Sequence, residues 1–265
     1  MILKNRNAVI YGGGGAIGGA VARVFAREGA RVFIAGRTLG KLDRIASEIA
    51  AAGGAVEIAR VDALDSDAVN AHAATVADRA GSIDIALNAV SFMHDQGTTI
   101  HDLSLDDFML PIDRFLRAQF ITSKAVTRYM GGKRPGVILT LSEPGSKLAV
   151  PGILGHSAAA AGKEAFSRVL AAELAPRNIR VVCLRPHAIV DAPEAGSFTK
   201  DVFKRMATAA GQPVTGLIAG MAQGTLLKRL PTLSDVAETV AFLASDRAAA
   251  MTGTVANLSC GTLVD

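Results

Sequence analysis

Asn7-Ala-Val-Ile-Tyr11-Gly12-Gly-Gly-Gly15-Ala-Ile-Gly18 is the stretch that decides the fold. Its apolar first part, Asn7–Tyr11, has the composition of a buried strand, and the glycine run leads directly into a segment with helical periodicity. A turn without side chains at this point lets backbone N–H groups and the amino end of a helix approach a diphosphate. A glycine run alone is also typical of a flexible linker, so its position between strand and helix is what indicates phosphate binding.

Strand-like and helix-like segments alternate along the chain. Short, mostly apolar runs typical of strands are Asn7–Tyr11, Arg31–Ala35, Ala55–Val61, Ile83–Leu87, Gly136–Leu141, Ile179–Leu184 and Thr254–Leu258. Longer segments with helical periodicity lie between them, at Gly18–Glu28, Leu39–Ala52, Ser66–Ala80 and Ser104–Met130. Strands that are apolar on both faces and separated by helices predict a parallel sheet covered on both sides. We therefore expect an α/β fold, a Rossmann-type doubly wound sheet of about seven strands in a three-layer α/β/α sandwich.

No linker, repeat or low-complexity block divides the 265 residues, so a single dinucleotide-binding domain over residues 1–265 is predicted. One long stretch, Asp191–Thr225, reads as irregular and carries aromatic and methionine residues among Gly and Pro. It follows the strand predicted over Ile179–Leu184, at the carboxyl edge where such sheets bind ligands. We expect it to cover a small-molecule substrate, and a solvent-exposed insertion is the alternative.

Composition narrows the classes of partner. The net charge is +4, and the basic residues are spread along the chain without interleaved aromatic residues, which argues against nucleic acid as a partner. Two cysteines, Cys183 and Cys260, are too few for a disulfide framework and match no metal motif, so no metal site is expected. No apolar run has the length of a membrane span, and no separate apolar signal segment precedes the first strand. We expect a cytoplasmic protein with no membrane partner.

The end of the second predicted strand bears on the choice of cofactor. In this position an acidic residue would hydrogen-bond the ribose hydroxyls of NAD, but the sequence there is Ala35-Gly36-Arg37-Thr38. A guanidinium beside the adenosine ribose suits a 2′-phosphate. NADP(H) is therefore favoured over NAD(H), and a solvated surface charge is the alternative interpretation of Arg37.

With these features the chain resembles the short-chain dehydrogenase/reductase family along nearly its whole length. The family's glycine motif, T-G-x-x-x-G-x-G, is matched with Tyr11 for the Thr and Ala16 for the middle Gly. Leu87–Val90 corresponds to the family's N-N-A-G segment, and Ala241–Asp246 to its closing F-L-A-S-D segment. The turn, the end of the second strand and the resemblance together predict a cofactor-binding set: Gly12, Gly14, Gly15, Ile17, Gly18, Arg37, Thr38, Asp62, Ala63, Asn88, Ala89, Val90, Pro186 and Ile189. The resemblance also implies a homotetramer or homodimer.

The catalytic positions depart from the family pattern. Family members use a Tyr acid/base, a Lys four residues later that lowers its pKa, a Ser about thirteen residues earlier and an Asn in a preceding helix. Alignment places His156 at the Tyr position, Ala160 at the Lys, Glu143 at the Ser and Phe115 at the Asn. The tyrosines of the chain, Tyr11 and Tyr129, lie elsewhere. The family's ordinary tyrosine mechanism is therefore not expected here.

Replacement and loss of the chemistry are the two explanations. In the first, His156 titrates near neutrality without help from a lysine, and Glu143 accepts its hydrogen bond and holds its tautomer. Ser142, beside Glu143, and Lys163, seven residues after His156, complete the candidate catalytic set. The protein would then be an NADP(H)-dependent oxidoreductase acting on a small carbonyl or alcohol. The alternatives are a catalytically silent NADP(H)-binding protein, either a regulator or a partner subunit, and a scaffold that binds no nucleotide.

Overall fold

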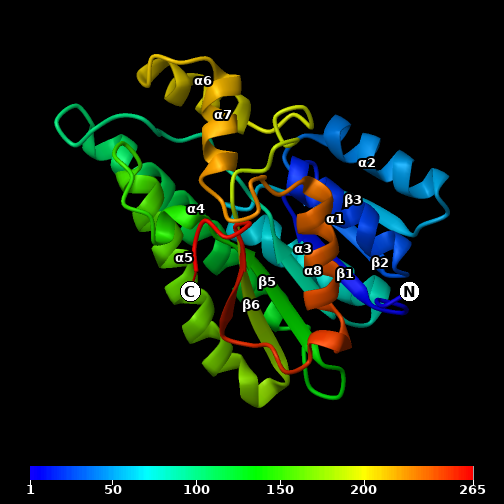
Figure 1. The fold of residues 1–265 in the computed structure, drawn as a ribbon. Helices are drawn as coiled ribbons and strands as arrows, with labels where there is room; N and C mark the ends of the chain where they lie inside the picture. Colours follow the sequence, from blue (N-terminus) through cyan, green and yellow to red (C-terminus); the bar gives the residue numbers. More distant parts are fainter. Residues whose placement is uncertain (265) are drawn as a thin grey trace.

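Seven parallel strands form the centre of the protein, as the computed structural model shows for residues 1–264 (Figure 1). The strands are β1 (Asn7–Tyr11), β2 (Arg31–Gly36), β3 (Val56–Arg60), β4 (Ile85–Asn88), β5 (Gly136–Leu141), β6 (Ile179–Pro186) and β7 (Thr254–Leu258). Their order in the sheet is β3-β2-β1-β4-β5-β6-β7. The predicted doubly wound α/β fold is confirmed.

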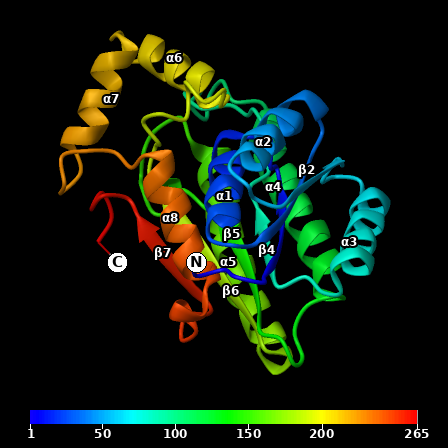
Figure 2. The same cartoon turned by 90° about the vertical axis from the view of Figure 1, so that its right-hand side faces the viewer.

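Helices cover both faces of this sheet (Figures 1 and 2). They are α1 (Ala16–Arg27), α2 (Leu39–Ala51), α3 (Ser66–Ala80), α4 (Leu105–Thr127), α5 (Leu154–Leu174), α6 (Thr199–Ala209), α7 (Val214–Gln223) and α8 (Leu233–Ala244). Helices α1, α2 and α8 pack on one face over one apolar core, and α3, α4 and α5 pack on the other over a second. Among the described residues, no helix is both long enough and apolar enough to cross a membrane.

The order in which the chain adds strands to the sheet reverses at β1. Strand β1 pairs with β2 on one side and with β4 on the other, so the connections that leave their carboxyl ends diverge. Ligands of open parallel sheets bind in the crevice at such a point. Both the glycine turn after β1 and the segment after β4 begin there, which brings the two halves of the candidate site together.

Helices α6 and α7 occupy much of residues 191–225, so the prediction of an irregular segment is wrong for that part. In α7, Val214, Leu217, Ile218 and Met221 have the three- and four-residue spacing of one helix face. Glycines within α7 and the Gly-Gln-Pro sequence before it concealed this periodicity, because both residue types disfavour helices. The two helices stand above the carboxyl edge of the sheet, at the top of Figures 1 and 2.

Candidate active site

The glycine turn is held by the backbone and leaves no room for a side chain at Gly12 or Gly18. Gly12 has a φ of 83°, and the N–H groups of Gly12 and Gly13 donate to the carbonyl of Ala35 at 2.9 and 3.0 Å. A Cβ on Gly12 would lie 2.4 Å from the Ala89 oxygen, and a Cβ on Gly18 would lie 2.3 Å from the Gly12 oxygen. Helix α1 then begins without a side-chain cap, so the N–H groups of its first turn remain available to an anion.

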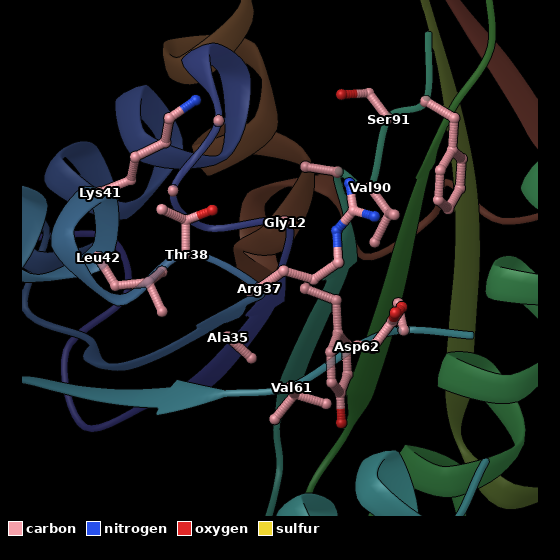
Figure 3. Close-up of a pocket in the computed structure, with 17 residues that line it drawn as sticks. Gly12, Ala35, Arg37, Thr38, Lys41, Leu42, Val61, Asp62, Val90 and Ser91 are labelled. Carbon is pink, nitrogen blue, oxygen red and sulfur yellow. The ribbon is translucent and has the colours of Figure 1, made fainter. Parts of the chain in front are cut away.

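A cleft of about 130 Å³ opens beside this turn (Figure 3). Nine residues of the predicted cofactor-binding set line it: Gly12, Gly14, Gly15, Arg37, Thr38, Asp62, Ala63, Ala89 and Val90. Lys41, Ser91 and Phe92 also line it and were not predicted. Figure 3 shows the Arg37 side chain reaching across the cleft from the end of β2, and the guanidinium carbon lies 5.8 Å from the Phe92 ring centre.

The other predicted cofactor residues lie outside the lining of this cleft. Gly18 packs on the turn, and Ile189 is buried in the core. The Asn88 amide donates to Thr122 Oγ1 at 3.0 Å, and its oxygen accepts from the Val90 N–H at 3.1 Å. Asn88 therefore shapes the segment that forms the wall of the cleft. Ile17 and Pro186 are likewise absent from the lining.

The Tyr11 side chain is buried in the protein interior. Its hydroxyl lies 3.3 Å from His72 Nδ1 on α3, and the two rings meet edge to face. Burial raises the pKa of Tyr11 and lowers that of His72 to about 4, so both groups are neutral at pH 7. Tyr11 also lines the cleft beside the glycine turn, while its hydroxyl contacts His72.

Two histidines meet beyond the cleft, on the side toward β5. His156, in the first turn of α5, places its Nδ1 3.0 Å from Nε2 of His94, which follows β4. The rings are nearly parallel, with an interplanar angle of 9°. Phe115 and Phe198 both pack edge-on against the His94 ring, with centroids at 5.5 and 5.9 Å.

The sequence predicted that His156 titrates near neutrality, and this prediction is wrong. Burial lowers its pKa to about 4, and the charge of Glu143 raises it only in part. At pH 7 the imidazole is therefore neutral and carries one free lone pair. It is poised to accept a proton more than to donate one.

Glu143 accepts its hydrogen bonds from Lys163 and not from His156, which corrects a second prediction. The Lys163 ammonium donates to both carboxylate oxygens at 2.8 and 2.9 Å and lies 4.6 Å from the centre of the Phe115 ring. Seven residues along α5 bring Lys163 to the face that carries His156. The Lys163 side chain is only 6% exposed, so its charge needs this partner.

Comparison with known proteins shows to which family the chain belongs. A family model described as enoyl-(acyl carrier protein) reductase matches residues 14–262. Nodulation protein G of Rhizobium meliloti (strain 1021) is 31% identical over 260 residues, which are 98% of this chain and 97% of that protein. The chain belongs to the short-chain dehydrogenase/reductase family. Its members named among the relatives are reductases and dehydrogenases, so this is a family of oxidoreductases.

Two further relatives lie within this family. The 3-oxoacyl-(acyl-carrier-protein) reductase FabG of Chlamydia pneumoniae is 30% identical over 250 residues, 94% of each chain. A solved short-chain dehydrogenase/reductase from Serratia marcescens BCRC 10948 superposes with a TM-score of 0.83 at 22% identity, covering 99% of both chains. The second similarity shows that the fold is shared.

Ser142 is not at the site, although it was predicted beside the family's serine position. Its hydroxyl donates to Glu164 at 2.8 Å, and Glu164 is paired with the buried Arg185 at 2.7 and 2.9 Å. Neighbouring residues of an extended chain point to opposite sides, so Glu143 faces the cluster and Ser142 faces away from it. Ser142 therefore belongs to a buried ionic network on the other side of the strand.

His94 and Gln96 are members of the cluster that sequence reasoning missed. The Gln96 amide nitrogen lies 3.0 Å from His94 Nε2 and 3.4 Å from His156 Nδ1. His94 and His156 are 62 residues apart, and no local pattern links them. The usable signal was topological, because the segment after β4 and the start of α5 meet at the same edge of the sheet.

Proposed function

We propose that this protein is an NADP(H)-dependent oxidoreductase of the short-chain dehydrogenase/reductase type, in which His156 replaces the family's tyrosine. Its substrate would be a small carbonyl compound or alcohol. The observation that carries the proposal is the His94–His156 contact of 3.0 Å beside a glycine-lined cleft, in a chain whose tyrosines lie elsewhere. The chain is then a divergent member of its family, without the usual Tyr, Lys, Ser and Asn.

The residues of the cleft suit a dinucleotide. The turn after β1 offers N–H groups to a diphosphate, and Arg37 offers a guanidinium to a 2′-phosphate. Bound there, NADP(H) would supply or accept a hydride. This fit rests on positions where a side chain could not stand, chiefly Gly12 and Gly18.

His156 handles the proton. Because its pKa is lowered to about 4, the neutral imidazole is ready at pH 7 to take the proton of an alcohol hydroxyl. In the reverse direction the imidazolium returns this proton to the carbonyl oxygen. The Glu143 carboxylate favours the imidazolium and Lys163 opposes it, so their pairing moderates both effects. The rate of alcohol oxidation should therefore hold from neutral pH downward and fall as the pH approaches 4.

Replacement of His156 tests the enzyme hypothesis. We expect His156→Ala to lower kcat by roughly 10²- to 10⁴-fold on a substrate found by screening alcohols and carbonyls, because that is the contribution of a positioned acid/base. The affinity for NADPH, measured by fluorescence titration, should be retained. His101→Ala, at an exposed histidine, is the matched control. Unchanged turnover in His156→Ala would contradict the assignment.

A catalytically silent NADP(H)-binding protein, acting as a regulator or partner subunit, is the second candidate. The lowered pKa of His156 favours it, since almost no imidazolium is present at pH 7 to donate the proton that reduction of a carbonyl needs. Micromolar NADPH binding without turnover of any substrate in the panel would support this candidate. A scaffold that binds no nucleotide would show no thermal stabilisation by either cofactor, because a bound ligand raises apparent stability.

The preference for NADP(H) over NAD(H) rests on Arg37. No acidic residue ends β2, and the exposed Arg37 side chain reaches into the cleft (Figure 3). We expect Arg37→Ala to weaken NADPH binding by about tenfold and NADH binding much less, because only NADPH carries the 2′-phosphate. Arg44→Ala, at an exposed arginine of α2, is the control. Equal losses for the two cofactors would remove Arg37 from the cofactor site.

Several features support a substrate cover and an assembly. Phe198, from the predicted cover over residues 191–225, already contacts His94. Phe120 on α4 and Val169 on α5 are 53% and 56% exposed, as a homodimer or homotetramer packed through these helices would require. A cytoplasmic location and a small-molecule substrate complete the proposal. Light scattering on the purified protein, compared with Phe120→Glu, tests the assembly.

A further inference from the structure

We propose that His94 is a positioning residue that fixes the tautomer of His156, so that Nε2 of His156 is the atom that takes and returns the proton. This inference rests on the proposed function and deepens it. His94 lies just after the cleft-lining Phe92 and is 6% exposed. Nothing in the family's motif, as this chain matches it, gives this position a task.

The backbone decides which nitrogen of His94 is protonated. Its Nδ1 lies 2.8 Å from the carbonyl oxygen of Phe92. A carbonyl oxygen only accepts, so Nδ1 of His94 must carry the proton. In a neutral imidazole Nε2 is then the acceptor. Burial lowers the pKa of His94, which keeps the ring in this neutral form.

The protonation of His94 in turn fixes that of His156. Its Nδ1 is 3.0 Å from the unprotonated Nε2 of His94, so Nδ1 of His156 must be the donor. The Gln96 amide nitrogen lies 3.0 Å from the same Nε2 and is a second donor that shares its one lone pair with Nδ1–H of His156. Nε2 of His156 is thus left with the free lone pair.

Packing holds this chain of hydrogen bonds in one arrangement. Phe115 and Phe198 bracket the His94 ring, and its two nitrogens are both used. Gly145 packs against the other edge of His156, where a Cβ would lie 2.8 Å from the His156 Cδ2 and 3.2 Å from Nε2, so only a glycine fits beside this ring position. The charged groups that act on His94 are Glu143, Lys163 and Asp95.

The proton step balances on this arrangement. In alcohol oxidation the substrate O–H bond would break and an N–H bond would form at Nε2 of His156, while the carbinol C–H bond would break and its hydride would pass to an oxidised nicotinamide cofactor. The carbonyl product and the imidazolium result. His94 accepts a hydrogen bond from Nδ1–H throughout and neither gains nor loses a proton, just as a carboxylate orients a catalytic histidine in hydrolases.

Two variants of His94 separate positioning from packing. In His94→Gln a side-chain carbonyl can still accept from Nδ1–H of His156, whereas His94→Leu fills the space without an acceptor. Long-range ¹⁵N–¹H NMR of histidine-labelled protein reads the tautomers directly, and the chain has only five histidines to assign. We expect an Nδ1–H His156 in the wild type and in His94→Gln, and its loss in His94→Leu.

Kinetics give the second measurement. We expect kcat to fall roughly 10- to 100-fold in His94→Leu and about threefold or less in His94→Gln, with unchanged NADPH affinity in both. The acid limb of the pH–rate profile should shift only in His94→Leu. Equal damage in the two variants, or an Nε2–H His156 in the wild type, would overturn the inference.

The outcomes distinguish this inference from the proposed function. If no substrate is turned over, or His156→Ala stays active, the proposed function fails, and the wild-type and His94→Gln spectra still decide the tautomer. If His94→Leu does not fold, the same two spectra suffice. If His156 is protonated at Nδ1 in both proteins, the proposed hydrogen-bond chain is supported. If His156 is not protonated at Nδ1 in either one of them, the inference is wrong.

Discussion

The glycine-lined cleft and the imidazole cluster lie at the same edge of the sheet, but they are built in different ways. One wall of the cleft is backbone without side chains, contributed by the glycine turn between β1 and α1. The cluster is made by side chains from three separate segments, around His94, Glu143 and the first turns of α5. Glycines in the local sequence indicate a cleft of this kind. In the cluster, by contrast, tertiary packing determines which side chains pair.

The contrast also predicts which changes each region tolerates. The glycine turn of the cleft should be damaged by a Cβ added at Gly12 or Gly18, where it would lie 2.4 or 2.3 Å from a backbone oxygen. The cluster should be damaged by loss of one partner, because the other is then left buried and unsatisfied.

Adding a methyl group to the turn should have the largest effect. In Gly18→Ala the new Cβ would lie 2.3 Å from the Gly12 oxygen, so the turn or α1 must move. We expect the free energy of unfolding to fall by about 3 kcal/mol and NADPH binding to be lost. Urea unfolding and NADPH titration measure the two effects.

Gly40→Ala is the control for that experiment. Nothing lies within 4 Å of a Cβ at this position in α2, so stability should be unchanged or rise by up to about 1 kcal/mol. NADPH affinity retained in Gly18→Ala would show that the turn is not the phosphate site.

Breaking the ion pair of the cluster should have an intermediate effect. Glu143→Gln leaves the Lys163 ammonium, 6% exposed, without its counter-charge, and we expect a loss of about 1–3 kcal/mol in unfolding free energy. The effect is limited because the Glu143 side chain is 33% exposed and water replaces part of the interaction. Urea unfolding of Glu143→Gln, Lys163→Met and the double variant gives the coupling energy. Strictly additive losses would mean that the two side chains do not stabilise each other.

The smallest effect is a change in how stability depends on pH. Burial lowers the pKa of His72 to about 4 from its usual 6.5, so between these values the unfolded chain binds a proton that the folded chain does not. The contribution of His72 is therefore complete above pH 6.5 and is lost as the pH falls toward 4. In His72→Gln, which can still bond the Tyr11 hydroxyl, we expect the slope near pH 5 to decrease by about 1 kcal/mol per pH unit. Identical slopes in urea unfolding of the two proteins would contradict the shift.

Local pattern predicted the fold because each element carries its own signal. The strands Asn7–Tyr11 and Gly136–Leu141 and the helix Ser66–Ala80 have the predicted ends, and Ser104 caps α4 by accepting from the Asp107 N–H. The prediction of an irregular segment in place of α6 and α7 was wrong for an equally local reason, since glycine and proline interrupt the helical periodicity there. Nine cleft-lining residues followed from the turn, the end of β2 and the family resemblance.

The sequence by itself determined the doubly wound sheet and the glycine turn at its crevice. These depend on residue type and short spacing, which fix backbone geometry. The tertiary structure alone decided that His156 pairs with His94, that Glu143 pairs with Lys163 and that Ser142 faces the other way. Those pairings join segments distant in sequence, and burial then sets the pKa of each group, which no spacing along the chain encodes.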